Sequence, residues 1–155
     1  MNNELLIDFC KVVRDSTLKR LRVVPEGYEN WSSSKNALSF AEIAKHLIEL
    51  DDWTIKKINE PDIESILPEE GSIDNCSNER FKELIMELER SLIRKIDFIN
   101  TLDKEMMNSK IYDDRFDGEV SIWWIFLRGN LDHEIHHRGQ IAVYLRILKD
   151  ENKIR

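Results

Sequence analysis

Apolar residues recur every three or four positions through four long stretches of the chain, and this period constrains the fold more than any other feature of the sequence. The stretches run from about residue 3 to 23, from 39 to just before Pro61, from 77 to 102, and from 120 to 148. Such spacing places apolar side chains on one face of an α-helix. Only five glycines and three prolines occur in 155 residues, mostly between the stretches. We therefore expect an all-α fold, an antiparallel four-helix bundle.

Local signals mark where the helices begin and how they are joined. Ser39 and Glu42 have the spacing of a capping box, in which each side chain bonds a free backbone amide at the start of the second helix. Residues 60–75 carry several acidic side chains and no basic one, which indicates a solvated connection. Residues 111–121 contain two turn-forming pairs and indicate a short extended excursion before the last helix.

Length and charge limit the function classes that the chain fits. A chain of 155 residues suits one domain, residues 1–155, and its 30 acidic and 23 basic side chains give a formal net charge of −7. The basic residues are interleaved with acidic ones, so we expect no nucleic-acid partner. The longest apolar run has six residues, Ile122–Leu127, against about 20 needed to span a bilayer. With no secretory signal and two cysteines, the chain is expected to be cytoplasmic, with no membrane partner.

The histidines are the strongest candidates for chemistry. His133 and His137 are four residues apart on the last helix, which places them on one face with about 5–6 Å between their Cβ atoms. His46 lies on the core face of the second helix. Two imidazoles at this spacing hold one divalent ion, and a third from a facing helix leaves an open position. Spacing alone leaves a second interpretation open, in which these are hydrogen-bonded core histidines. His136 points elsewhere and is expected at the surface or behind a ligand.

The segment His133–His137 also matches the HExxH pattern of zinc peptidases, in which the glutamate is the general base. The longer form of that pattern fails, because Gln140 and Val143 stand where it requires glycine and histidine. Glu134 is the nearest candidate for a catalytic base, but on a helix it points well away from the two histidines. The peptidase interpretation is therefore the weakest of those considered.

Other candidate residues have ordinary alternatives. Glu42 and Glu49 flank His46 at four residues before and three after, so either could orient its ring, or both could be solvated glutamates. Cys10 and Cys76 lack the spacing of metal ligands, and buried thiols are the simpler interpretation. No further residue type forms a recognisable catalytic pattern.

A longer motif resembles a known family. The segment His133–Gln140 reads HEIHHRGQ and resembles the HxxxHRGQ signature of the DinB-like (DinB/YfiT) family of four-helix metalloproteins. Upstream, residues 21–26, Trp31, residues 38–42 and His46 resemble that family's first loop and second helix. The resemblance covers nearly the whole chain and is most specific in the last helix.

The resemblance implies a site and a class of activity. Members of the family bind a divalent ion, often nickel or zinc, through three histidines, which correspond here to His46, His133 and His137. They are commonly homodimers, and some join low-molecular-weight thiols such as bacillithiol to electrophiles. The function expected from this resemblance is that of a metal-dependent thiol S-transferase or hydrolase with a small-molecule substrate. The alternative is a non-catalytic dimeric bundle whose metal is structural.

Overall fold

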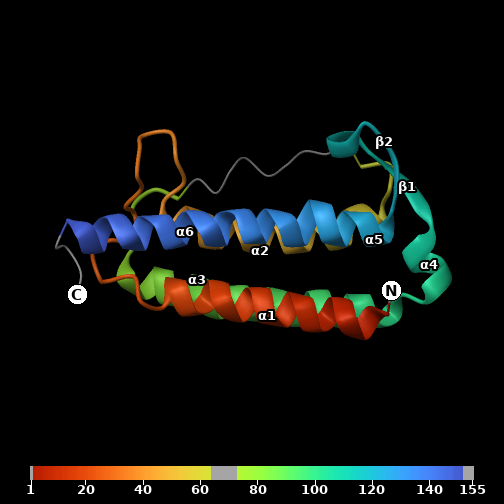
Figure 1. Cartoon of the computed structure of the whole chain (residues 1–155), viewed down its shortest axis with the longest axis horizontal. Coiled ribbons are helices and arrows are strands. Elements are labelled where there is room, and N and C mark those ends of the chain that lie inside the picture. Colours follow the sequence, from red (N-terminus) through yellow and green to blue (C-terminus); the bar gives the residue numbers. More distant parts are fainter. Residues whose placement is uncertain (1, 64–72, 152–155) are drawn as a thin grey trace.

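The computed structural model of the chain describes residues 2–63 and 73–151. Its four long helices form a bundle, as Figure 1 shows, and confirm the expected all-α architecture. They are α1 (Asn3–Leu21), α2 (Phe40–Asn59), α3 (Asn78–Thr101) and α6 (Asp132–Asp150). Among the described residues, none of the helices is both long enough and apolar enough to traverse a membrane.

The chain between α3 and α6 forms six short elements at one end of the bundle. The sequence order is α4 (Lys104–Asn108), β1 (Lys110–Asp113), η1 (Asp114–Phe116), β2 (Gly118–Ser121), α5 (Ile122–Trp124) and the π-helical segment η2 (Ile125–Leu131). Strands β1 and β2 pair antiparallel, with Lys110 opposite Ser121. This hairpin confirms the extended excursion predicted for residues 111–121.

The four helices run in two directions. Asn3, at the start of α1, donates hydrogen bonds to the carbonyls of Ile99 and Leu102 at the end of α3, so these two helices are antiparallel. Helices α2 and α6 are antiparallel as well, whereas α1 runs parallel to α6 and α2 parallel to α3 (Figure 1). A long connection must return the chain between α2 and α3. The acidic connection predicted for this part falls largely on residues 64–72, which lie outside the described residues.

The predicted start of α2 is confirmed in detail. The Ser39 hydroxyl accepts a hydrogen bond from the Glu42 amide at 3.2 Å, and the Glu42 carboxylate accepts one from the Ser39 amide at 2.7 Å. This capping box satisfies two amides that the helix leaves unpaired. Glu42 therefore acts at the helix end, which accounts for one of the two glutamates that flank His46.

The last helix differs from the prediction. It begins at Ile122 with Ser121 as its cap and passes through η2 before α6, whereas the apolar period predicted a regular helix from about residue 120. A π-helical turn contains an extra residue, and such turns occur often at functional sites. Trp123 is 8% exposed and Trp124 is 46% exposed, because neighbouring residues of a helix point in different directions.

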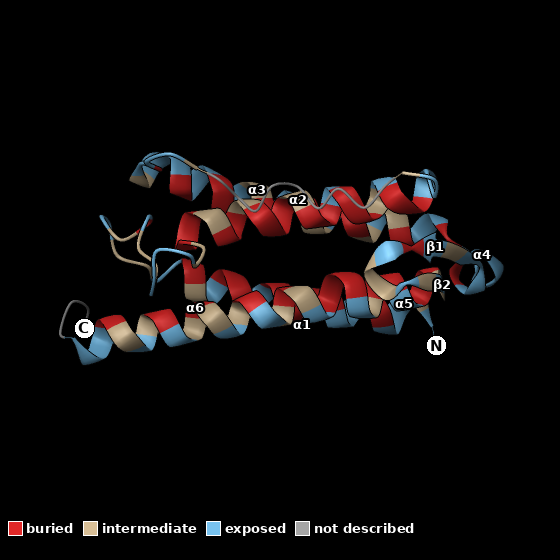
Figure 2. Cartoon of the chain, turned by 90° about the horizontal axis from the view of Figure 1, so that it is seen from above, coloured by how far each residue is buried: buried red, intermediate tan, exposed pale blue. Residues whose placement is uncertain are grey.

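The core consists of two apolar clusters with a polar layer between them. One cluster lies toward the end of α1 and the start of α2, and the other lies toward the hairpin. Figure 2 shows buried positions along the inner faces of all four long helices. Between the clusters lie four charged side chains that are at most 1% exposed, which we call the buried charge layer: Arg14, Asp51, Lys95 and Glu134.

Candidate metal centre

Helices α2 and α6 bring three histidines together. His46 comes from α2, and His133 and His137 come from successive turns of α6. The Nε2 atoms of His46 and His133 are 2.8 Å apart, and each pair of rings in the trio has its centroids 4.9 Å apart. One nitrogen from each ring lies within 4.8 Å of the others, so the three are close enough to hold one metal ion. We call these residues the histidine trio.

The surroundings keep two of these imidazoles neutral, those of His46 and His133. Burial lowers the pKa of His46 to about 4, with a smaller contribution from the charge of His137. Burial likewise lowers the pKa of His133 to about 4, and the neighbouring histidines and Arg115 add to this effect. A neutral imidazole offers a nitrogen lone pair, which is the form that binds a metal. The neutral state of His46 and His133 at neutral pH therefore fits a metal site.

The orientation of His137 is fixed by a chain of hydrogen bonds. The Tyr144 hydroxyl donates to the Leu38 carbonyl at 3.0 Å and accepts from the Gln140 amide nitrogen at 2.6 Å. The Gln140 amide oxygen then faces His137 Nδ1 at 3.0 Å, so that Nδ1 must be the donor. This assigns the proton to Nδ1, so that Nε2 is the ring nitrogen that carries the lone pair. Sequence reasoning missed this role of Gln140, although its position three residues after His137 was a signal.

One ring nitrogen of His46 lacks a hydrogen bond among the described residues. Its Nδ1 is buried and has no hydrogen-bond partner in the part of the chain that the structure describes. Glu49, expected as a possible partner of this ring, instead forms an ion pair with Lys45 at 2.8 Å. An unpaired buried nitrogen is costly and is rare away from ligand sites. The His46 nitrogen that faces the trio is Nε2, so the unpaired Nδ1 lies on another edge of the ring, and the fit to a bound cation depends on the three imidazole donors.

The remaining candidates lie apart from the trio. Glu134 is 1% exposed, and its two carboxylate oxygens accept hydrogen bonds from Arg14 at 2.8 and 3.0 Å. A catalytic role for Glu134 stays a prediction, and these contacts favour a structural one. His136 is exposed, as expected. Cys10 and Cys76 are buried free thiols outside the trio, and burial raises the pKa of both.

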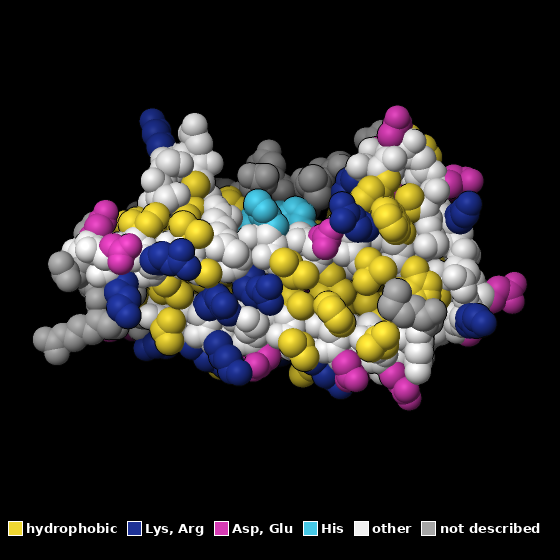
Figure 3. Space-filling view, in the orientation of Figure 1, with side chains coloured by type: hydrophobic (Ala, Val, Ile, Leu, Met, Phe, Trp, Pro, Cys, Tyr) yellow, Lys and Arg dark blue, Asp and Glu magenta, His cyan; other side chains and the backbone are white. Residues whose placement is uncertain are grey.

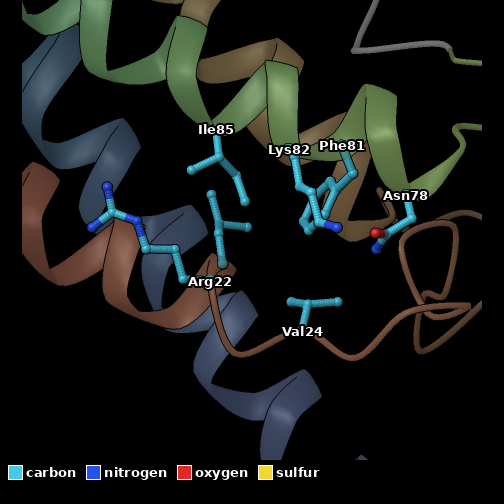
Figure 4. A pocket seen from close by; sticks show the side chains of 7 residues that line it. Arg22, Val24, Asn78, Phe81, Lys82 and Ile85 are labelled. Atoms are coloured by element: carbon cyan, nitrogen blue, oxygen red, sulfur yellow. The ribbon is translucent and has the colours of Figure 1, made fainter.

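Two members of the trio, His46 and His137, are buried, and His133 is half-buried. Figure 3 shows histidine side chains on the face turned to the viewer, in a hollow between the raised hairpin end and the raised loop end of the molecule. A separate groove of about 240 Å³ lies between the end of α1 and the start of α3 (Figure 4). Its floor contains Phe81 and Ile85 and its rim contains Arg22 and Lys82, with no histidine among its lining residues. That groove is therefore distinct from the candidate metal centre.

Comparison with known proteins agrees with this geometry. The family model described as the DinB family matches residues 1–151. The chain belongs to the DinB family. Among solved structures, a DinB-like protein from Bacillus subtilis matches with a TM-score of 0.69 and 16% identity, covering 94% of this chain and 92% of that one. Its fold is thus shared with a DinB-like protein. Among the curated proteins, none matches the chain.

DinB family membership and the histidine trio both fit a metal-binding protein of this family. The chain has the fold of a DinB-like protein, and it carries three histidines placed as a metal-binding group. The residues that the family resemblance implied as ligands are the same three that the structure brings together.

Proposed function

We propose that this DinB-family protein is a metal-dependent enzyme that transfers a low-molecular-weight thiol to an electrophile. The ion is held by His46, His133 and His137. The observation that carries the proposal is the convergence of these three side chains, with no fourth histidine, cysteine, aspartate or glutamate in the group among the described residues. Three protein ligands leave a coordination position for substrate, as in catalytic rather than structural zinc sites.

The protein's own residues would prepare the site in three ways. Burial keeps His46 and His133 neutral, so that no proton competes with the ion. Gln140 holds the Nδ1–H of His137, which aims the other nitrogen at the site. A bound divalent ion supplies a lowered pKa for a coordinated thiol or water, and hence a nucleophile near neutral pH. Three imidazoles suit nickel and zinc alike, so the proposal includes either ion.

Three alternatives share the trio. A hydrolase would use the same ligands with water in place of the thiol. A HExxH peptidase would need Glu134 as its base, and the bonds of that carboxylate to Arg14 and its burial disfavour this. A structural metal would hold the bundle together without chemistry, but structural sites are closed by four protein ligands.

Metal content tests the site directly. Plasma mass spectrometry on untagged protein should find about one nickel or zinc ion per chain, and far less in His133→Ala. His136→Ala is the matched control, because His136 is exposed on the same helix and is outside the trio. The control should keep the wild-type metal content. If the wild type takes up neither ion after both are supplied, the proposal fails.

Activity separates the alternatives. The metal-loaded protein should consume a small thiol in the presence of monochlorobimane, and chelation should abolish the rate. If the metal-loaded protein consumes the thiol no faster than the chelated sample but hydrolyses ester substrates, the protein is a hydrolase and not a transferase. A tightly held ion with no exchangeable water and neither activity would support the structural alternative.

We also propose that the partner of this chain is a second copy of itself. Leu5, Phe9 and Val12 are 53%, 57% and 69% exposed and lie on one face of α1. Figure 3 shows apolar side chains gathered on the face that α1 and α6 present. Contiguous apolar surface of this kind marks an interface. Phe9→Glu should halve the mass measured by light scattering. Val23, in the loop after α1, is 62% exposed, close to the 57% of Phe9, and Val23→Glu should leave the mass unchanged.

A further inference from the structure

The hairpin places an arginine between the two helices that carry the histidine trio. The Arg115 guanidinium carbon is 4.2 Å from the centre of the Trp53 ring on α2, and its Nη1 is 3.3 Å from the Gly129 carbonyl in η2. Trp53 follows His46 by seven residues and Gly129 precedes His133 by four. These intervals correspond to whole helical turns, so both contacts lie on the same helix faces as the trio.

Arg115 contacts the helical turn that precedes His133, through the Gly129 carbonyl. Along the helix, the four residues from Gly129 to His133 correspond to roughly 5–6 Å. A small molecule that is bound at the trio and extends toward the hairpin would therefore meet this guanidinium.

The position of Arg115 is fixed before any ligand arrives. Asp113, which is fully buried, accepts hydrogen bonds from Arg115 Nε at 2.9 Å and from Nη2 at 2.5 Å. A Cβ atom at Gly129 would lie 2.8 Å from Nη2, so the absence of a side chain there makes room for the guanidinium. A rigidly held donor loses little entropy when it binds a ligand.

The guanidinium still has hydrogen-bonding capacity. It carries five N–H groups. Asp113 accepts one from Nε and one from Nη2, and the Gly129 carbonyl accepts one from Nη1. One N–H on each terminal nitrogen has no partner in the described ranges 2–63 and 73–151. The side chain is 15% exposed, so solvent or a ligand reaches it. Two N–H groups on neighbouring nitrogens are what a carboxylate uses when it binds arginine in a bidentate manner.

We propose that Arg115 anchors the acidic end of the substrate, which is a short thiol that carries a carboxylate. The carboxylate would accept the two remaining N–H groups of Arg115 while the sulfur reaches the histidine trio. This inference rests on the proposed thiol chemistry and specifies its substrate class. Asp113 already balances the charge of Arg115, so the discrimination comes mainly from the hydrogen bonds and is about tenfold in affinity.

Cobalt-loaded protein tests the inference, since a thiolate that binds cobalt gives an absorption band. The two probes are 4-mercaptobutanoate and its uncharged counterpart 4-mercaptobutan-1-ol. The wild type should bind the acid about tenfold more tightly than the alcohol. Arg115→Gln should reduce this ratio to near one while leaving the affinity for the alcohol unchanged. Arg115→Lys keeps the positive charge but lacks the paired N–H groups of the guanidinium, and it should give an intermediate ratio.

Arg128→Gln is the matched control. Arg128 also stacks on a tryptophan, with its guanidinium carbon 5.8 Å from the Trp124 ring centre, and is exposed and paired with Asp132. This variant removes the same charge from the same end of the bundle and should keep the wild-type ratio. Equal loss of affinity for both thiols in the Arg115 variants would show that Arg115 only holds the hairpin, and would overturn the inference.

The outcomes separate this inference from the function on which it rests. If the wild type binds no cobalt, the metal centre fails and the substrate assignment fails with it. If cobalt binds both thiols but the ratio is the same in the wild type and Arg115→Gln, only the role of Arg115 is overturned. Metal content and thermal unfolding measured on every variant distinguish these results from a loss of fold.

Discussion

The buried charge layer and the histidine trio are neighbouring polar clusters with opposite properties. In the layer, Asp51 Oδ1 accepts from Lys95 at 2.6 Å and from Asn130 at 3.0 Å, while Oδ2 accepts from Arg14 and Ser91, each at 2.8 Å. In the trio, His46 Nδ1 has no partner among the described residues. The layer is saturated by its own side chains, whereas the trio is not.

The layer supports the fold, whereas the trio has the geometry of a metal-binding group. The layer contains two acids and two bases, so its charges balance. Burial alone would raise the pKa of Asp51, but Lys95 and Arg14 hold it well below its usual range. A cluster with every acceptor filled has no capacity for a ligand. Adjacent residues of α6 thus belong to different systems, with Glu134 in the layer and His133 in the trio.

Breaking the layer should give the largest effect. Arg14→Met leaves the carboxylates of Asp51 and Glu134 buried without their shared partner, and removal of one member of such a network costs about 3–5 kcal/mol. Urea unfolding measures the change in the free energy of unfolding. Arg90→Met, on the exposed face of α3, should change it by less than about 0.5 kcal/mol. A loss below about 1 kcal/mol in Arg14→Met would contradict the structural role of the layer.

Filling the trio should stabilise the protein by a smaller amount. Free metal at a hundred times its dissociation constant adds about 2.7 kcal/mol to the free energy of unfolding. At about 2–4 °C per kcal/mol for a domain of this size, the melting temperature should rise by roughly 5–11 °C. Calorimetry with and without a chelator checks this. The same shift in His46→Ala would mean that the ion binds elsewhere.

The hydrogen-bond chain behind the trio should tune metal affinity. Gln140→Leu leaves His137 Nδ1 without its acceptor, and loss of such a partner weakens metal binding about 10- to 100-fold. Competition with a coloured chelator measures the dissociation constant. Tyr144→Phe removes only the hydroxyl that orients Gln140 and should have a weaker effect in the same direction. Unchanged affinity in both variants would show that His137 needs no such support.

The metal-free protein should also become less stable as the pH falls. His46 and His133 have pKa values of about 4 in the folded protein, below the ordinary value of 6.5. The unfolded chain therefore binds more protons between these values, and stability is lost as pH falls from about 6.5 toward 4. Melting temperatures across this range check the slope. The double variant His46→Gln, His133→Gln should show a shallower slope, and an equal slope would assign the loss to carboxylates instead.

Local sequence features predicted much of the fold and of the trio. Ser39 and Glu42 predicted the start of α2, because a capping box depends on residues three apart. The spacing of His133 and His137 predicted a shared helix face, and the apolar neighbours of His46 predicted that it points inward. Each of these predictions uses interactions within one or two helical turns.

Interactions between distant segments could not be predicted in this way. Arg14 and Glu134 are 120 residues apart, and no local pattern indicates that they meet. The π-helical segment was missed because the apolar period continues through it, although Asn130 at its end reaches the Asp51 carboxylate at 3.0 Å. Arg115 was missed because a turn residue gives no sign of the helix against which it folds.

Because Glu134 and His133 are adjacent in α6, the position of α6 that places His133 in the trio also places Glu134 in the buried charge layer. A slip of α6 by one residue would remove Glu134 from Arg14 and His133 from His46 at once, so one event governs both. Amide hydrogens in this part of α6 should then exchange only through global opening. The hairpin lies outside the four-helix frame, so a change there would leave the packing that positions the trio in place.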